Sequence, residues 1–149
     1  MFDYQNIFHT GFLVPDIDVA MKEMGDALGL EWATPWRHDP MKYWTPQGNA
    51  EASMLITYSK RGPQHVELIQ GTGYWTSSAV QGVHHVGVWS ANMPAEIADL
   101  TARGWTVMAA AASPEEGWKH FCYLRPPSGG MLLELVSTDI KPLMAQRLA

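Results

Sequence analysis

Apolar residues along the chain follow two spacings, which predict strands and helices in an order that occurs twice. Residues 7–14 form a run of β-branched and aromatic side chains that is typical of a strand. At 17–28 the apolar residues recur at steps of three and four, as on the buried face of a helix. The same two patterns return at 83–89 and 94–103. We therefore expect two modules that each begin with a strand and a helix.

Each module is expected to continue with three more strands, which gives a repeated β-α-β-β-β order. These strands are predicted at 30–36, 52–58 and 65–69 in the first module, and at 105–110, 118–124 and 131–136 in the second. The expected fold is α+β, with a mixed sheet built from tandem modules in a single domain. Module one covers about 5–70, a linker 71–82, module two 83–138, and a C-terminal tail 139–149 that forms a short helix.

The segment 37–48 is the largest difference between the two modules. It contains Pro40, Pro46 and Gly48 and is predicted to be a long loop. It also carries Tyr43 and Trp44, which are unusual in a solvated linker. Because long loops in compact domains are usually functional, we expect either a wall or lid over a substrate or a contact with a partner subunit.

The first strand of each module carries a His that is followed two positions later by Gly. His9 and Gly11 in the first module correspond to His85 and Gly87 in the second, 76 residues further along. His84 precedes His85 in the first strand of the second module, but neighbouring residues of a strand point to opposite faces. The position of the Gly selects His85 as the counterpart of His9, and His84 is expected to be structural.

The last strand of each module carries a carboxylate among apolar residues. Glu67 interrupts the run 66–69 and Glu134 interrupts the run 133–136. Burying a carboxylate costs several kcal/mol unless a cation or hydrogen bonds compensate it. One His and one Glu from each module therefore form a candidate metal site assembled by duplication.

Composition and charge exclude several classes of partner. The net charge is −5 and the charged residues are scattered, which argues against nucleic acid and membrane surfaces. No apolar stretch approaches the roughly 18 residues that a membrane span needs, and the N-terminus does not resemble a signal peptide. The single Cys122 cannot form an internal disulfide, which fits a reducing compartment. We expect a cytoplasmic protein that binds a small molecule.

This arrangement resembles the vicinal oxygen chelate superfamily, which includes glyoxalase I, methylmalonyl-CoA epimerase, extradiol dioxygenases and bleomycin- and fosfomycin-resistance proteins. The resemblance covers 7–136 and is most specific at 8–16 (FHTGFLVPD), 84–88 (HHVGV) and 127–135 (PSGGMLLEL). The last segment looks most like the epimerase branch. The resemblance implies a cupped sheet that holds a metal ion, with ligand roles for His9, Glu67, His85 and Glu134. It also implies a homodimer, with each site within one subunit or shared across two.

Nitrogen and oxygen ligands without a thiolate favour a divalent ion such as Ni, Co, Mn, Fe, Mg or Zn. Such an ion can polarise a carbonyl and stabilise an enolate, while Glu67 or Glu134 moves a proton on the adjacent carbon. The expected enzyme is therefore an isomerase, epimerase or lyase that resembles glyoxalase I or the epimerase. Its substrate is expected to be small, and an aromatic ring or a thioester is compatible with it.

Two other functions remain open at this point. A non-haem iron dioxygenase prefers two His and one carboxylate, and Glu67 would occupy its vacant position. A non-catalytic protein that sequesters a drug between Trp-rich walls would need no metal. Candidate residues for the substrate pocket are Trp36, His38, Tyr43, Trp44, His65, Trp118 and His120. Of these, His65 shares the strand face of Glu67, and would either support the ligands or lie in solvent.

Overall fold

The computed structural model describes residues 3–77 and 82–149. Positions 78–81 of the expected linker lie outside the described residues. The strands are β1 (Ile7–Leu13), β2 (Trp36–Thr45), β3 (Gly48–Tyr58), β4 (His65–Gly71), β5 (Val83–Ser90), β6 (Thr106–Ala110), β7 (Phe121–Arg125) and β8 (Leu132–Ser137). The α-helices are α1 (Ile17–Leu28), α2 (Met93–Ala102) and α3 (Lys141–Leu148). Short 3₁₀ turns lie at Tyr4–Asn6, Gly73–Trp75, Pro114–Glu116 and Thr138–Ile140.

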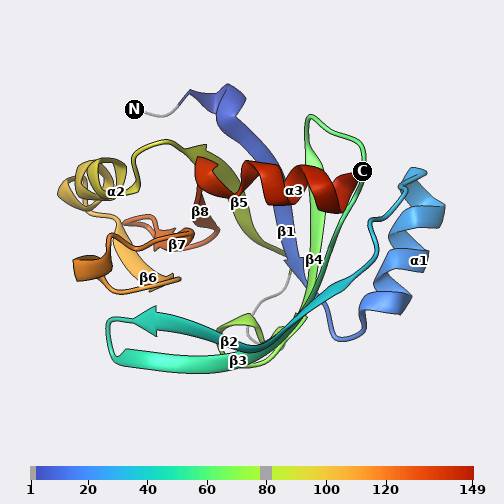
Figure 1. Cartoon of the computed structure of the whole chain (residues 1–149), viewed down its shortest axis with the longest axis horizontal. Coiled ribbons are helices and arrows are strands. Elements are labelled where there is room, and N and C mark those ends of the chain that lie inside the picture. The colour runs from blue at the N-terminus through green and yellow to red at the C-terminus, as the bar shows by residue number, and fades with distance from the viewer. Residues whose placement is uncertain (1–2, 78–81) are drawn as a thin grey trace.

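The strands form one sheet made of two halves with the same internal order. The order around the sheet is β1-β4-β3-β2-β6-β7-β8-β5, and the sheet closes on itself (Figure 1). In each half the first strand pairs in parallel with the fourth, as β1 with β4 and β5 with β8. The halves meet along the antiparallel pair β1–β5, and on the other side through the single pair Trp44–Ala110. The expected α+β fold with tandem β-α-β-β-β modules is confirmed.

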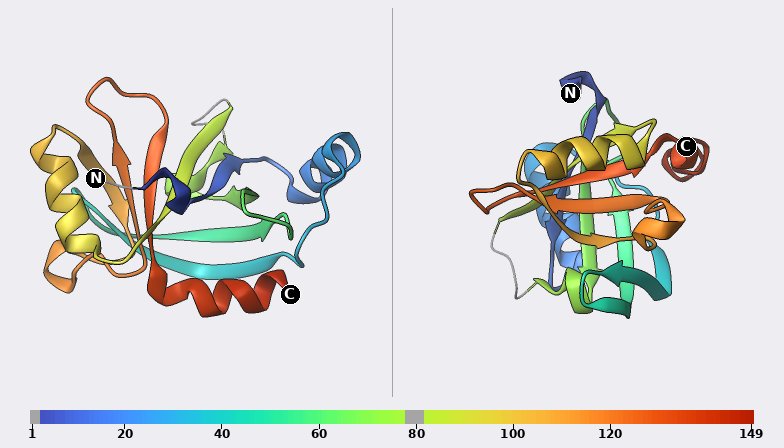
Figure 2. Two further views of the ribbon diagram at one scale, coloured as in Figure 1. Left: turned by 90° about the horizontal axis from the view of Figure 1, so that it is seen from above. Right: turned by 90° about the vertical axis from the view of Figure 1, so that its left-hand side faces the viewer.

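Helices α1 and α2 lie outside the sheet and leave its inner face for the site. The Asp16 side chain accepts hydrogen bonds from two backbone amides at the start of α1, and Gly29 ends this helix at φ 68°. Helix α2 buries Met93, Ile97 and Leu100 against the outer face of the second half. Helices α1 and α2 lie at opposite ends of the molecule (Figure 2).

The expectation of a long loop at 37–48 is wrong, because most of this segment is strand. Strands β2 and β3 form a hairpin whose register runs from Trp36–Ile56 to Thr45–Gly48. Pro40 fits because the register shifts between His38 and Met41, so its missing N–H breaks no regular ladder. The extra residues of the first module therefore lengthen a hairpin, and His38, Met41 and Lys42 of this hairpin line the cavity that is described below.

Two shorter segments also differ from the expected strands. The predicted strand at 30–36 is reduced to an isolated bridge between Trp32 and Ser59 before β2 begins. The predicted strand at 118–124 begins only at Phe121, because Trp118 and Lys119 adopt left-handed φ values of 66° and 59°. Such values are incompatible with an extended strand.

The tail after β8 contains helix α3, which lies across the sheet in Figure 1. Met144 on this helix is buried and belongs to the same apolar cluster as the aromatic residues on the inner face of the sheet. Helix α3 thus closes part of the inner space of the sheet. Within 3–77 and 82–149, none of the helices has the length and apolar character that crossing a membrane requires.

Candidate metal centre

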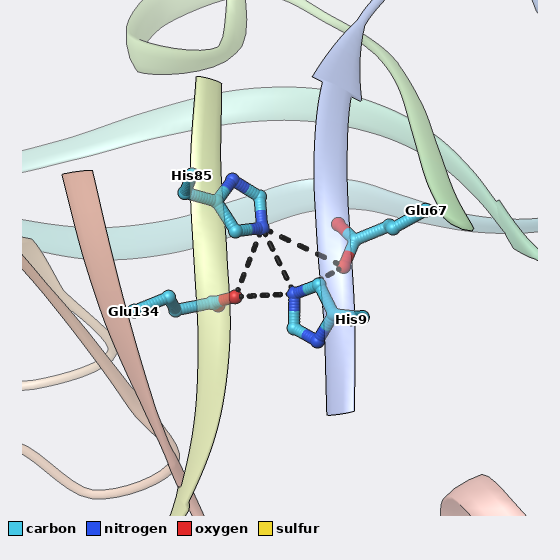
Figure 3. Close-up of side chains that lie close together, drawn as sticks. All are labelled: His9, Glu67, His85 and Glu134. Atoms are coloured by element: carbon cyan, nitrogen blue, oxygen red, sulfur yellow. Dashed lines mark hydrogen bonds and ion pairs between the residues drawn. The ribbon is translucent and has the colours of Figure 1, made fainter. Parts of the chain in front are cut away.

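Four buried side chains point at one another from the inner face of the sheet (Figure 3). They are His9 from β1, Glu67 from β4, His85 from β5 and Glu134 from β8. One nitrogen or oxygen atom from each side chain lies within 4.8 Å of those of the other three. All four belong to the same chain, so this constellation is complete without a second subunit.

The spacing of these atoms fits a single small cation. His9 Nε2 lies 2.9 Å from His85 Nε2, 3.0 Å from Glu134 Oε2 and 3.1 Å from Glu67 Oε2. His85 Nε2 lies 3.1 Å from Glu134 Oε2 and 3.8 Å from Glu67 Oε2. Ligands held about 2.1 Å from one ion are about 3.0 Å apart at adjacent octahedral positions and about 3.4 Å apart at tetrahedral ones. The four residues therefore could hold a divalent ion.

The repeated His-x-Gly pattern is explained by the pairing of β1 with β5. In this antiparallel pair His9 lies opposite Gly87, and Gly11 lies opposite His85. A Cβ at Gly87 would lie 1.9 Å from the His9 ring, and a Cβ at Gly11 would lie 2.1 Å from the His85 ring. Each imidazole thus packs directly on the glycine of the other module. Packing is what orients His9, because its buried Nδ1 has no hydrogen-bond partner among the described residues.

The two carboxylates have tyrosine neighbours at equivalent positions, but the hydroxyls of these tyrosines make different hydrogen bonds. Tyr58 is the cross-strand partner of Glu67, and Tyr123 is the cross-strand partner of Glu134. The Tyr58 hydroxyl donates a hydrogen bond to Glu67 Oε2, the oxygen that faces His9. Burial and the charge of Glu67 raise the pKa of Tyr58 well above its usual value, so this hydroxyl stays protonated. The Tyr123 hydroxyl instead accepts a hydrogen bond of 3.1 Å from Trp75 Nε1.

His84 supports the centre although it is not one of the four converging residues. Its Nδ1 lies 2.9 Å from His85 Nδ1, and its side chain is buried. Burial and the neighbouring His85 lower the pKa of His84 to about 4, so it is neutral at pH 7. A neutral imidazole can accept the Nδ1 proton of His85 and leave Nε2 of His85 free for a metal ion.

Metal binding is expected to release about one proton per ion from His85 near neutral pH. Burial lowers the pKa of His85, but Glu134 and Glu67 outweigh it and raise this pKa to about 10 in the metal-free protein. Apparent affinity should therefore rise about tenfold per pH unit from about pH 7 to 9. Titration calorimetry in two buffers of different ionisation enthalpy measures the proton count, and a count of zero would contradict this ligand set.

The ion pair between His85 and Glu134 also affects the stability of the metal-free fold. The pKa of His85 in the folded chain, about 10, lies above its unfolded value of about 6.5. The stabilisation is therefore complete below about pH 6.5 and is lost as the pH rises through about 10. Glu134 acts in the opposite direction: His85 and His9 outweigh the effect of burial and hold its pKa well below the usual range, so its contribution is lost in acid.

A cavity of about 290 Å³ opens onto this centre, and we call it the central cavity. Its polar lining includes Glu67 and Glu134, whereas His9 and His85 are fully buried and do not line it. Its aromatic walls are formed by Trp36, Tyr58, Trp75, Phe121 and Tyr123. Ile140, just before helix α3, also lines the cavity, as do Leu143, Met144 and Arg147 of that helix. A small substrate entering this cavity would meet the two carboxylates first.

Of the seven residues expected in the substrate pocket, three line the central cavity: Trp36, His38 and His120. The other four lie elsewhere. Trp44 and Trp118 pack on each other beside the outer cluster under α2, with ring centres 5.6 Å apart. Tyr43 is buried beside Trp75, and His65 Nδ1 lies 2.6 Å from the carbonyl oxygen of Ser59. None of these four lines the central cavity, because the faces of the strands decide which side chains enter it, and an expected loop does not define such faces.

Residues that the sequence analysis did not single out also shape the site. Tyr58 and Tyr123 are 65 positions apart, close to the 67 that separate Glu67 from Glu134, so the repeat itself contained this signal. Trp75 lies in the expected linker, yet it is buried and lines the central cavity. Arg147 has no counterpart in the repeat, and its place in the cavity follows only from how α3 packs.

Comparison with known proteins agrees with the resemblance drawn from the sequence. The family model of the Glyoxalase/Bleomycin resistance protein/Dioxygenase superfamily matches residues 8–123. No protein of curated function matches the sequence. Solved structures show the same fold at low identity. One is a methylmalonyl-CoA epimerase in complex with methylmalonyl-CoA and NH4+, with 20% identity, a TM-score of 0.58, and coverage of 89% of this chain and 93% of that one.

Two further structures are similar over nearly the whole chain. The methylmalonyl-CoA epimerase from Mycobacterium tuberculosis is 16% identical, with a TM-score of 0.57 and 92% of each chain covered. A hypothetical protein from Bacillus halodurans is 15% identical, with a TM-score of 0.63 and coverage of 89% of this chain and 93% of that one. At these identities the structures show the fold, while the family model covers most of the chain. The chain therefore belongs to the glyoxalase, bleomycin-resistance protein and dioxygenase superfamily.

Proposed function

We propose that this protein is a metal-dependent isomerase, epimerase or lyase that transfers a proton on the carbon next to a carbonyl group. The centre would be held by His9, Glu67, His85 and Glu134, with a divalent ion that polarises the carbonyl oxygen when bound. The observation that carries the proposal is the position of the two carboxylates. Both belong to the group of four converging side chains, which we call the ligand cluster, and both line the central cavity. Either can therefore reach a bound substrate.

Glu134 is the better candidate for the base, because Glu67 is tied down. The Tyr58 hydroxyl donates to Glu67 Oε2, which stabilises that carboxylate in place and weakens it as a base. Among the described residues, the Tyr123 hydroxyl makes no corresponding hydrogen bond to Glu134, although it accepts one from Trp75 Nε1. Glu134 is therefore free to turn from its two imidazoles towards a substrate carbon, where it would accept the proton and return it.

Replacing Tyr58 with Phe is expected to weaken metal binding by about 10- to 100-fold, because the hydrogen bond that orients Glu67 is lost. Tyr123→Phe is the matched control, since it removes the equivalent hydroxyl of the other module without removing a bond to a carboxylate. Calorimetric metal titration of both variants makes the comparison. Equal losses of affinity in the two variants would show that Tyr58 has no special role in holding Glu67.

The proposed reaction is tested by exchange of a substrate α-proton with deuterated water. The protein is first stripped of metal and then titrated with Ni, Co, Mn, Fe, Mg or Zn, and exchange is followed by NMR. A panel of α-hydroxy ketones, hemithioacetals and acyl-CoA esters covers the substrate classes that such a centre serves. We expect metal-dependent exchange on at least one class. No metal-dependent exchange across the panel would remove the proposal.

Two measurements on the same metal-free and metal-loaded protein distinguish the two other functions. Oxygen uptake with a catechol in the presence of Fe(II) would indicate a dioxygenase. A protein that only sequesters an aromatic ligand would bind it equally well with and without metal. The aromatic walls of the central cavity suit a ring-bearing ligand in either case, so the response to metal is what separates these functions.

A further inference from the structure

We propose that the central cavity selects a substrate carrying a carboxylate or similar anion at the end remote from the metal centre, and that Arg147 binds this group. The inference rests on the proposed function, since it names the class of substrate for the same site. It is carried by the position of Arg147, by the lack of an acidic partner for it in 3–77 and 82–149, and by the balance of charge within the cavity.

Arg147 is positioned by a stack of aromatic rings that leads to the metal centre. Its guanidinium carbon lies 4.2 Å from the centre of the Trp36 ring. Trp36 in turn is parallel to Tyr58, with ring centres 5.7 Å apart and an interplanar angle of 1°. Tyr58 donates to Glu67. All four side chains line the central cavity, so the guanidinium and the ligand cluster belong to one continuous surface.

Within the part of the chain that the structure describes, no carboxylate forms an ion pair with the guanidinium of Arg147. Among the described residues, the ion pairs within 4.0 Å that involve Lys or Arg are made by Lys22, Lys60, Arg61, Arg103 and Lys119. Partial burial lowers the pKa of Arg147, and burial and Arg147 lower the pKa of His38, which also lines the cavity. A partly desolvated, unpaired guanidinium is well suited to a carboxylate, which it can bind through two parallel hydrogen bonds.

The charges of the cavity favour an anion once a metal ion is bound. Lys42 and Arg147 supply two positive charges, and Glu67 and Glu134 supply two negative ones. These cancel when the histidines are neutral, so the two charges of a divalent ion remain uncompensated. An anionic group bound at Arg147 would balance part of this excess.

Helix α3 provides a matched control for this role. Lys141 at its start also lies over a Trp ring, 5.2 Å from the centre of Trp89, but it does not line the central cavity. If Arg147 only packed α3 against the sheet, Arg147→Met and Lys141→Met would have similar effects. If Arg147 binds an anion, only its replacement changes the preference for charged ligands.

The probes are 4-phenylbutyrate and its neutral amide, and binding to the metal-loaded protein is followed by quenching of Trp fluorescence. We expect the wild type and Lys141→Met to bind the carboxylate about 10- to 100-fold more tightly than the amide. Arg147→Met should lose most of this preference, and Arg147→Glu should lose it entirely. Thermal melting of each variant verifies folding.

A carboxylate preference that stays undiminished in both Arg147 variants would show that the metal alone attracts the anion, and would overturn the inference. Equal binding of the two probes by the wild type would overturn it as well. Because this measurement needs no turnover, it separates the two proposals. Loss of the preference in Arg147→Met together with an absence of proton exchange would leave the anion site standing and remove the proposed reaction.

Discussion

Replacing Glu134 with Gln is expected to slow metal-dependent α-proton exchange by about 100- to 10,000-fold, the range that a positioned general base contributes. The amide keeps the size of the side chain and an oxygen that can face the metal, but it cannot accept the proton. Metal content should therefore change much less than exchange. Exchange is measured by NMR in deuterated water, and metal content by elemental analysis of the same samples.

Glu67→Gln is the matched variant for this prediction. Its amide oxygen can still accept the Tyr58 hydrogen bond and face the ion, so exchange should fall by about tenfold or less. Equal losses in the two variants would contradict the assignment of Glu134 as the base. A loss confined to Glu67→Gln would reverse the roles of the two carboxylates.

Gly87→Ala is expected to remove most metal binding and to destabilise the metal-free fold. The added Cβ would lie 1.9 Å from the His9 ring, which is fully buried and cannot move away without leaving the centre. Overpacking of this kind costs about 1–3 kcal/mol, and displacement of a ligand lowers metal affinity by about 10- to 100-fold or more. Urea denaturation and calorimetric metal titration measure the two effects.

Gly11→Ala should have the same consequences through the His85 ring, since the two glycines have equivalent positions in β1 and β5. Gly25→Ala is the control, because this glycine lies in α1 and an added Cβ would come no closer than 3.1 Å to a neighbouring side-chain atom. Metal affinity that is unchanged in Gly87→Ala would show that the His9 ring does not occupy the position seen in the structure.

The ligand cluster could be predicted from the sequence because each of the two modules contributes one His and one Glu at corresponding positions. A His-x-Gly pattern is rare enough to be noticed, and its recurrence fixed which of His84 and His85 faces inward. The pairing of β1 with β5 supplies the physical reason, since each imidazole needs a glycine opposite it. The order of strands and helices followed from the same repeat, and it is confirmed.

The hairpin of β2 and β3 could not be predicted from the same signals. Pro40, Pro46 and Gly48 are typical of a loop, but here Pro40 lies at a register shift and Gly48 lies at the turn of the hairpin. Because the segment was expected to be irregular, its side chains could not be assigned to faces. Trp44 was therefore expected at the substrate although it packs on Trp118 outside the cavity.

The remaining parts of the site depend on packing between distant segments. Tyr58 and Tyr123 have equivalent places in the repeat, yet Tyr58 donates to Glu67 whereas Tyr123 accepts from Trp75, which lies outside both sets of predicted strands. Arg147 reaches the cavity only because α3 packs Met144 against the inner apolar cluster. No spacing within the sequence specifies such contacts.

Anomalous diffraction from crystals of protein purified without chelators and loaded with one transition-metal ion tests the shared centre most directly. We predict one strong peak per chain, about 2.0–2.3 Å from Nε2 of His9 and His85 and from one carboxylate oxygen each of Glu67 and Glu134. A peak bound elsewhere, or fully loaded crystals in which any of these four side chains turns away from the ion, would contradict a cation held jointly by the two modules.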